Sequence, residues 1–382
     1  MLHFTQDEFD SRREQVLEAM KERKLDALLM FAQESMYWLT GYDTFGFCFF
    51  QCLVLKSDGS MTLLTRSADL RQARLTSILT DVHIWRDGAN AKPVHDLRAL
   101  LTDLGLLGTR IGIEYETHGL TAAMGREIDN ELTTFANLED ASTVVHHLRV
   151  VKSSAEIKHV RRAAELADLA LDAALETTKA GANEATILAA MQGAVLENGG
   201  DYPGNPFILG SGEEALLCRY RSGRRKLSKN DQLTIEWAGV QAQYHVAMMR
   251  TLVVGKPRPE HERYFEAARD ALLAVESAMV VGNTFGDLFT AHKDVLDAAG
   301  LSKHRLNACG YSLGARYAPS WMDGPMFYNN NGFEIRPGMT LFAHMIIMDS
   351  ETGTAMTLGQ TYLTGEKKPK SLSRHGLDFV VL

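Results

Sequence analysis

A change of pattern at residues 150–154 is the sequence feature that most constrains how this chain can fold. Ser153 and Glu156 have the spacing of a capping box, in which two side chains satisfy free backbone N–H groups at a helix start. Residues 155–179 then predict a long amphipathic helix, because apolar side chains recur at helical spacing: Ile157, Val160, Ala164, Ala167, Leu171 and Leu175. In a chain of 382 residues, a boundary here predicts two domains, residues 1–150 and 151–382.

Helix and strand signals alternate through the first of these domains. Thr5 and Glu8 form another capping box, which predicts a helix that ends near Lys24. Apolar runs predict further elements: strands at 27–31, 49–55, 61–65 and 110–114, and a helix near 120–130. A Ser-Asp-Gly turn signal at 57–59 joins two of the runs into a hairpin. This alternation indicates an α/β domain with a covered sheet.

The second domain mixes helices and strands without a regular alternation. Asn183 predicts the cap of a second helix after the long amphipathic one. The remaining expected elements are two helices and four strands: helices near 260–279 and 285–299, strands near 232–235, 243–254, 339–347 and 354–363. This arrangement is typical of an α+β domain.

Composition excludes several classes of function. The net charge of −8 argues against a nucleic-acid partner or an anionic membrane surface. The 4 cysteines form no close pair, so neither a disulfide framework nor a zinc knuckle is expected. The chain has no basic N-terminal segment followed by an apolar stretch, and no apolar run long enough to cross a membrane. We therefore expect a cytoplasmic protein without a membrane span.

Several segments form a set of motifs in a fixed order. They are residues 35–43 (Ser-Met-Tyr-Trp-Leu-Thr-Gly-Tyr-Asp), 199–203 (Gly-Gly-Asp-Tyr-Pro), 232–239 (Gln-Leu-Thr-Ile-Glu-Trp-Ala-Gly), 243–255, 309–314 (Cys-Gly-Tyr-Ser-Leu-Gly) and 336–342 (Arg-Pro-Gly-Met-Thr-Leu-Phe). Together they resemble motifs of the creatinase/prolidase family, the pita-bread enzymes, and the first two are most similar to ectoine hydrolase. The resemblance covers nearly the whole chain.

The resemblance implies a fold and an assembly. It implies an α/β N-terminal domain of the ribonuclease-H-like, creatinase type, an α+β C-terminal pita-bread domain, and a homodimer. The loop with Phe45 and Phe47 resembles one that reaches the partner's active site in creatinase-like dimers. Both residues are therefore candidate substrate-binding residues, although a hydrophobic subunit contact explains them equally well.

Most metal-ligand positions of the family have changed in this chain. Metallopeptidases of the family bind two divalent metals through two Asp, one His and two Glu. By motif, the corresponding positions here are Glu236, Ala247, Tyr311, His344, and Gly359 or Gln360. Hard divalent cations need several converging carboxylates, so Glu236 and His344 alone do not make a dinuclear site. We expect no metal and no other cofactor, as in creatinase and ectoine hydrolase, which resemble metal-free versions of the fold.

Glu236 and His344 are the candidate catalytic residues. Glu236 lies in an apolar strand, where burial raises the pKa of a carboxyl group and suits it to act as base or nucleophile. A structural ion pair with Arg219 or Arg250 is the alternative explanation. His344 is predicted to be the acid, although a histidine on an apolar strand is often only a core residue.

Three further residues are candidates for substrate binding. Arg219 replaces the catalytic histidine that the family places six residues before an arginine, here Arg225, and its guanidinium suits a substrate carboxylate. The alternative is a solvated charge in a basic loop. Tyr311 keeps a polar tip at a former ligand position, where it binds substrate or fills the vacated volume. His245 is adjacent to Tyr244, and alternation along the strand directs one of them to the pocket.

These residues predict a metal-independent hydrolase of a C–N bond in a small, carboxylate-bearing nitrogen compound. A metal-dependent Xaa-Pro dipeptidase or aminopeptidase is one alternative, and the missing ligands argue against it. A binding module without catalysis is the other alternative, because a fold does not fix a function. Lyase chemistry on the same fold also stays open.

Overall fold

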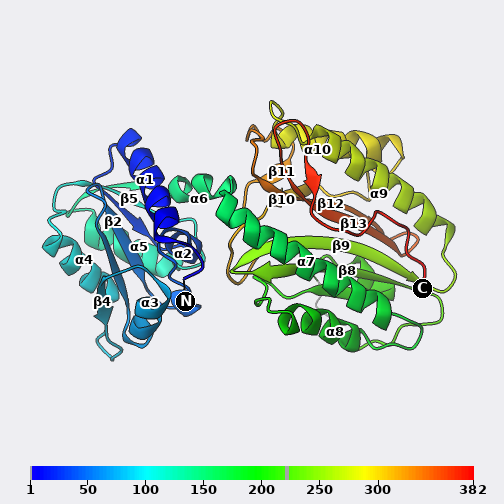
Figure 1. Cartoon of the computed structure of the whole chain (residues 1–382), viewed down its shortest axis with the longest axis horizontal. Helices are drawn as coiled ribbons and strands as arrows, with labels where there is room; N and C mark the ends of the chain where they lie inside the picture. The colour runs from blue at the N-terminus through cyan, green and yellow to red at the C-terminus, as the bar shows by residue number, and fades with distance from the viewer. Residues whose placement is uncertain (1, 220–222) are drawn as a thin grey trace. The chain divides into compact units, whose positions relative to one another are not determined.

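The computed structural model describes residues 2–219 and 223–382 and divides into two compact units, Met1–Arg149 and Val150–Leu382. Figure 1 shows both units, each with its own sheet and helices. Part of the basic loop of the sequence analysis, residues 220–222, lies outside the described residues. No helix in the described part is both long enough and apolar enough to span a membrane.

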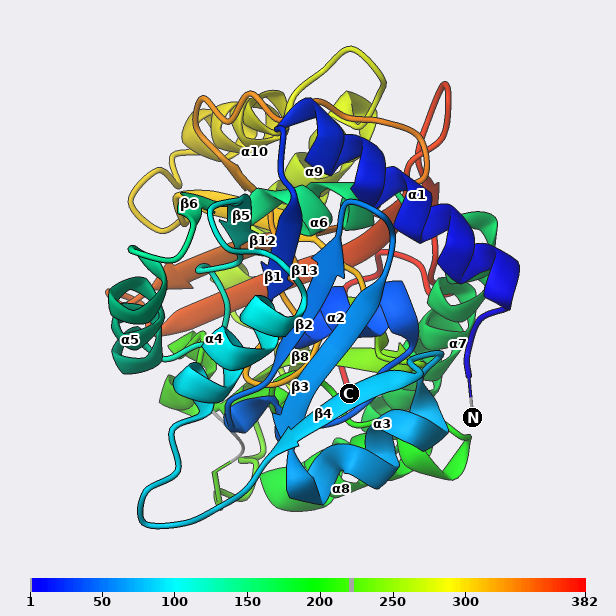
Figure 2. The ribbon, with the colours of Figure 1, turned by 90° about the vertical axis from the view of Figure 1, so that its left-hand side faces the viewer.

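The N-terminal unit is built on a 6-stranded sheet with the order β4-β3-β2-β1-β5-β6. Its strands are β1 (Ala27–Met30), β2 (Cys52–Lys56), β3 (Met61–Arg66), β4 (Asp81–Trp85), β5 (Arg110–Ile113) and β6 (Asn137–Asp140). β2 is antiparallel to both neighbours, whereas β4, β5 and β6 join the sheet in parallel. Figure 2 shows β2, β3 and β4 side by side.

Helices cover both faces of this sheet. They are α1 (Gln6–Glu22), α2 (Gln33–Thr40), α3 (Leu70–Thr76), α4 (Pro93–Asp103), α5 (Ala122–Leu132) and α6 (Thr143–Val150). Leu28 and Met30 of β1 belong to the apolar core shared with α1, α2 and α3. Leu29, between them, belongs to the core shared with α4 and α5, as the alternation of side chains along a strand requires.

The C-terminal unit contains an 8-stranded antiparallel sheet with the order β11-β10-β12-β13-β9-β8-β7, and β14 pairs with β13. Its strands are β7 (Ile208–Ser211), β8 (Asp231–Gln241), β9 (Tyr244–Val254), β10 (Ala308–Ser312), β11 (Met326–Tyr328), β12 (Thr340–Asp349), β13 (Thr354–Leu363) and β14 (Lys370–Ser371). Its helices are α7 (Ser154–Thr177), α8 (Glu184–Glu197), α9 (Pro259–Ala278) and α10 (Phe285–Ala298). Figure 1 shows α7 lying along β8 and β9.

The helices pack on one face of this sheet and leave the other face for the candidate site. On β8, the indole N–H of Trp237 donates to the Ala167 carbonyl of α7 at 2.8 Å. On β12, Ala343 and Met345 belong to the core shared with α9 and α10. Because side chains alternate along a strand, Glu236 and His344 point to the opposite face.

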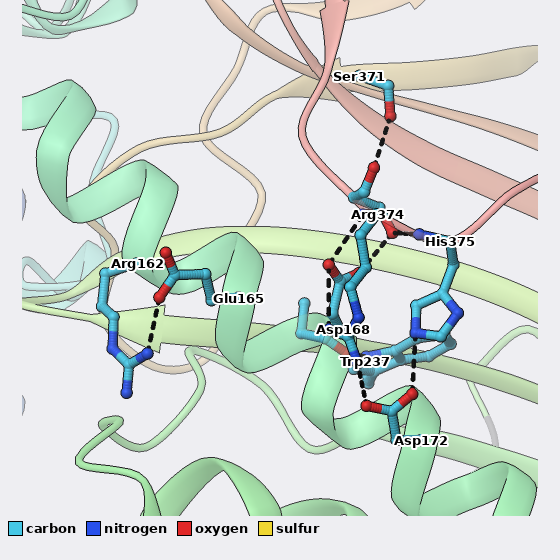
Figure 3. Close-up of polar contacts among 10 residues, drawn as sticks. Arg162, Glu165, Asp168, Asp172, Trp237, Ser371, Arg374 and His375 are labelled. Atoms are coloured by element: carbon cyan, nitrogen blue, oxygen red, sulfur yellow. Dashed lines mark hydrogen bonds and ion pairs between the residues drawn. The ribbon is translucent and has the colours of Figure 1, made fainter.

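The C-terminal segment adds polar contacts on the helix side, as Figure 3 shows. Asp168 of α7 accepts hydrogen bonds from the Ser373 hydroxyl and, at 2.9 Å, from the Arg374 amide. Asp172, one turn further, pairs with the Arg374 guanidinium and with His375 at 3.1 Å. These contacts hold residues 373–375 on α7, away from the face that carries Glu236.

The long periodic elements of the sequence analysis are confirmed. Ser153 and Glu156 form the capping box of α7, Asn183 caps α8, and β2 and β3 form the expected hairpin. Thr5 accepts from the Glu8 amide at the start of α1, but the Glu8 carboxylate bonds to Arg12. Several short elements have no clear signal in the sequence and were not predicted: α2, α3, α4, α6, β4, β6, β7, β10, β11 and β14.

Candidate active site

Glu236 lies in the middle of β8 on the face away from the helices. Only 8% of its surface is exposed, and its cross-strand neighbour on β9 is Met249. The Tyr311 hydroxyl donates to Glu236 Oε1 at 3.3 Å. Burial raises the pKa of Glu236 to about 7, against the opposing effects of the Arg219 charge and the Tyr311 hydrogen bond. A carboxyl group in this state exchanges a proton readily near neutral pH.

Tyr311, the partner of this carboxyl group, lies in a cluster of aromatic side chains. Tyr311 is buried on β10, and its hydroxyl accepts a hydrogen bond from the Trp321 indole N–H at 2.8 Å. The Tyr311 ring contacts Phe342 and His344 of β12, with centroids 5.4 and 5.6 Å apart. Tyr311 therefore contacts both candidate catalytic residues, Glu236 and His344.

His344 is buried, with 8% of its surface exposed. Burial lowers the pKa of its imidazole to about 3, and the charges of His292 and Arg219 act in the same direction. Its Nδ1 makes no hydrogen bond to any residue that the structure describes. The expected role of an acid is therefore at odds with the structure, because the ring is neutral at physiological pH. The Nδ1 atom is also closed off from solvent, and the ring packs against Tyr311 and Phe342.

Arg219 is exposed, and its role as a substrate-binding residue stays a prediction. Its positive charge nevertheless lowers the pKa of both Glu236 and His344. The guanidinium therefore lies near enough to act on both groups, at a solvent-accessible position. Arg250, the other ionic partner considered for Glu236, lies on the opposite face and donates to the Gly359 carbonyl and to Gln360 Oε1.

His245 points to the same face of β9 as Met249, whereas Tyr244 points to α7 and donates to Glu156 Oε1 at 2.7 Å. The His245 side chain is completely buried, and its Nε2 accepts a hydrogen bond from the Gly204 amide at 2.8 Å. Burial lowers its pKa to about 4. His245 Nε2 thus binds the backbone of the loop that contains Gly204. A contact between His245 and substrate was expected instead.

Among the five positions that correspond to family metal ligands, Ala247 and Gly359 have no donor atom in their side chains. Gly359 lies opposite His344 on the site face, whereas Gln360 points to the other face and contacts Arg250. A Cβ atom at Gly359 would lie 2.8 Å from the Phe342 ring and from the Met249 Cβ, so apolar side chains fill the ligand volume. The described residues include no group of three or more His, Cys, Asp or Glu that could hold a metal ion.

Phe45 and Phe47 lie in the N-terminal unit, around a short 3-10 helix, η1 (Gly46–Cys48). Phe45 is 82% exposed, which suits a contact with another surface. Phe47 is half-buried and lines a pocket of about 310 Å³ together with Phe50 and Trp85. Their contribution to a partner's site stays a prediction.

Two residues of the site were missed by sequence reasoning. Trp321 lies in an irregular loop, and the sequence gives no signal that its indole reaches Tyr311. Phe342 lies two residues before His344 on β12 and therefore on the same face of the sheet. The strand pattern could thus have placed it beside the histidine.

Comparison with known proteins identifies the family. Residues 158–366 match metallopeptidase family M24, and residues 12–151 match the creatinase/prolidase N-terminal domain. The chain belongs to metallopeptidase family M24. The predicted fold class, a creatinase-type N-terminal domain followed by a pita-bread domain, is thereby confirmed, and the chain is a member of a family of hydrolases and peptidases.

Proteins similar to this chain are named for different activities. The ectoine hydrolase of Halomonas elongata is 27% identical over 360 residues, which cover 89% of this chain and 89% of that protein. The Xaa-Pro dipeptidase of Pyrococcus horikoshii is 22% identical, over 81% of this chain and 82% of that one. The crystal structure of a dipeptidase from Pyrococcus horikoshii superposes with a TM-score of 0.85 at 21% identity, covering 97% of this chain and 100% of that chain.

Proposed function

We propose that the protein is a metal-independent hydrolase that cleaves a C–N bond in a small, carboxylate-bearing nitrogen compound. The observation that carries the proposal is the state of Glu236, a buried carboxyl group with a pKa of about 7 that Tyr311 holds in place. Apolar residues surround it where the metallopeptidases have metal ligands, since Ala247 and Gly359 offer no donor atom. A carboxyl group that exchanges protons near neutral pH, at a position without neighbouring metal ligands, supports acid–base catalysis by Glu236.

Glu236 alone can complete the proton transfers of hydrolysis. In its ionised form it removes a proton from water, and the water oxygen forms a bond to the carbon of the C–N group. It then returns this proton to the nitrogen as the C–N bond breaks, which releases an amine and restores the carboxylate. A pKa of about 7 makes both halves of this cycle accessible at neutral pH.

The neighbouring groups suit the binding of such a substrate. The exposed Arg219 guanidinium presents a planar pair of donors, the geometry that a substrate carboxylate accepts. The neutral His344 ring packs against Tyr311 and Phe342 and adds no charge to the surroundings of the carboxyl group. Tyr311 is fixed between Trp321 and Glu236 and orients the carboxyl group.

Two relatives favour different substrates. The likeness to ectoine hydrolase extends over most of the chain and supports a small C–N compound. The likeness to Xaa-Pro dipeptidases keeps a dipeptide as the second candidate. The packing of Phe342 and Met249 around Gly359 argues against the second candidate, to the extent that it requires two metals.

The test is turnover of a compound panel by protein treated with EDTA, repeated after addition of Mn²⁺. The panel contains cyclic amidines, ureas, N-acyl amino acids and Xaa-Pro dipeptides. We expect at least one compound without a peptide bond to be hydrolysed after EDTA treatment. Turnover of only a dipeptide, and only with Mn²⁺, would identify a metallopeptidase. Thermal stabilisation by a compound without its turnover would identify a binding module.

A further inference from the structure

A hydrogen-bonded chain connects a loop residue to the candidate catalytic carboxyl group. Trp321 is 1% exposed, and its indole Nε1 lies 2.8 Å from the Tyr311 hydroxyl oxygen. That oxygen lies 3.3 Å from Glu236 Oε1. The backbone amide of Trp321 donates to Asn205 Oδ1 at 3.1 Å, which anchors the loop backbone at this residue.

The direction of this chain follows from what each group can donate. An indole N–H is a donor only, so the Tyr311 oxygen must accept from Trp321. An ionised carboxylate is an acceptor only, so the single phenol proton of Tyr311 is available to Glu236. Trp321 therefore occupies an acceptor site on the phenol and leaves its proton directed at the carboxylate.

Tyr311 is suited to remain a permanent donor. Burial, followed by the negative charge of Glu236, raises the pKa of its phenol well above the ordinary value. The hydroxyl consequently keeps its proton throughout the range in which Glu236 titrates. A hydrogen bond from Tyr311 favours the ionised carboxylate over the protonated form.

Trp321 differs from two other buried tryptophans in the kind of group that accepts its indole hydrogen bond. Trp237 donates to the Ala167 carbonyl and Trp85 to the Phe50 carbonyl, so each pairs with a backbone oxygen. Trp321 donates instead to a side-chain hydroxyl that itself contacts a titrating group. The three side chains fill apolar volume alike, whereas only this indole is coupled to the candidate catalytic carboxyl group.

We propose that Trp321 is a positioning residue that acts through Tyr311, orienting the phenol proton toward Glu236 and favouring the ionised carboxylate. The proposal rests on the proposed function, because it assigns Trp321 a part in setting the proton affinity of the catalytic group. Trp321 does not transfer a proton itself. It determines how strongly Tyr311 stabilises the charged form.

The test measures the titration of Glu236 in the full-length protein, from the carboxyl infrared band that is absent in Glu236→Gln. We expect Trp321→Phe to raise the midpoint by about one pH unit, a tenfold change in proton affinity. Trp237→Phe is the matched control and should leave the midpoint unchanged. The Trp321→Phe/Tyr311→Phe double variant should shift no further than Tyr311→Phe alone, since Trp321 acts through the phenol.

A second measurement needs no substitution at Trp321. In protein labelled with ¹⁵N-tryptophan, the Trp321 indole resonance should shift with pH at the midpoint of Glu236, whereas the Trp237 resonance should not. The shift should vanish in Glu236→Gln. An unchanged Glu236 midpoint in Trp321→Phe, an additive double variant, or a Trp321 resonance independent of pH would overturn the proposal.

These measurements use no substrate, so the two proposals fail separately. If no compound of the panel is hydrolysed but the midpoints move as described, the proposed function is wrong and the coupling of Trp321 to Glu236 stands. If hydrolysis occurs and the midpoints do not move, Trp321 is a packing residue in a functioning enzyme.

Discussion

The properties of Glu236 follow from a conflict between burial and ionisation. Burial disfavours the charged form, and the Arg219 charge and the Tyr311 hydrogen bond offset only part of that cost. The folded-state pKa of about 7 lies above the ordinary value of 4.5. The protonated carboxyl group is thus better accommodated than the carboxylate, and this contribution to stability is present below pH 4.5 and lost as the pH rises through 7.

Glu236→Gln should accordingly stabilise the protein in alkaline solution. The glutamine keeps an oxygen for Tyr311 and never becomes charged. The rise in the pKa of Glu236 from 4.5 to about 7 corresponds to about 3 kcal/mol. The free energy of unfolding of the variant at about pH 8 should therefore exceed that of the wild type by up to that amount. At about pH 5 the gain should fall below about 1 kcal/mol. Urea unfolding at both pH values measures this, and an equal gain at both would contradict the pKa assigned to Glu236.

Arg219→Ala should act on substrate binding. Loss of the guanidinium should raise KM about tenfold or more and leave kcat nearly unchanged, because a carboxylate is bound equally in the ground and transition states. The acidic limb of the pH profile should move to higher pH, since the Arg219 charge lowers the pKa of Glu236. Arg224→Ala, an exposed arginine of the same loop, is the control. If both variants have equal effects, Arg219 is a solvated surface charge and not a substrate-binding residue.

At this scale the sequence identified the chemical groups but not their surroundings. Family motifs selected Glu236, Tyr311 and His344 as candidates, and strand alternation directs them to one face, where Tyr311 contacts the other two. The neutral state of His344 depends on burial by residues far away in the chain. The indole of Trp321 reaches Tyr311 from an irregular loop, for which no periodic pattern exists.

Among the elements, α2 shows why a helix can lack a sequence signal. Its N-cap residue is Ala32, which has no capping side chain. The Glu114 carboxylate, distant in the chain, accepts instead from the Phe31 and Ala32 amides and from the Ser35 hydroxyl. α7 carries its capping box in adjacent residues and was predicted correctly. A cap formed by adjacent residues can be recognised in a sequence, whereas a cap supplied by a residue far away in the chain cannot.

The contact between α7 and β8 gives a sharp test of packing. A Cβ at Gly239 would lie 2.0 Å from the Ala163 carbonyl oxygen, which is backbone and cannot rotate away. Gly239→Ala should therefore destabilise the C-terminal unit by more than about 2 kcal/mol. Gly193→Ala, in the interior of α8 with only a Glu197 side chain within 4 Å, should instead stabilise by about 0.5–1 kcal/mol. Thermal unfolding of both variants measures the contrast, and a harmless Gly239→Ala would contradict the close approach.

At the scale of the whole molecule, we expect a homodimer in which the exposed Phe45 contributes to the interface. An obligate interface buries more than about 2,000 Å² in total, so light scattering should show a dimer even in dilute protein. Phe45→Asp should weaken association, because it places a charge in an apolar contact. Leu75→Asp, at another exposed apolar position of the N-terminal unit, should not. A monomeric wild-type protein would remove Phe45 and Phe47 from the site.

The central claim is that Glu236 moves protons in this family member without a metal. The most direct test is the pH dependence of kcat/KM for a hydrolysed compound, measured after EDTA treatment and with the metal content determined on the same sample. We predict less than one transition metal per chain, with kcat/KM rising to a plateau through a pH of about 7, because the base must be ionised. Glu236→Gln should lower kcat by roughly 10²-fold or more. Two metals per chain and activity lost with EDTA, or a profile without a group near pH 7, would contradict the claim.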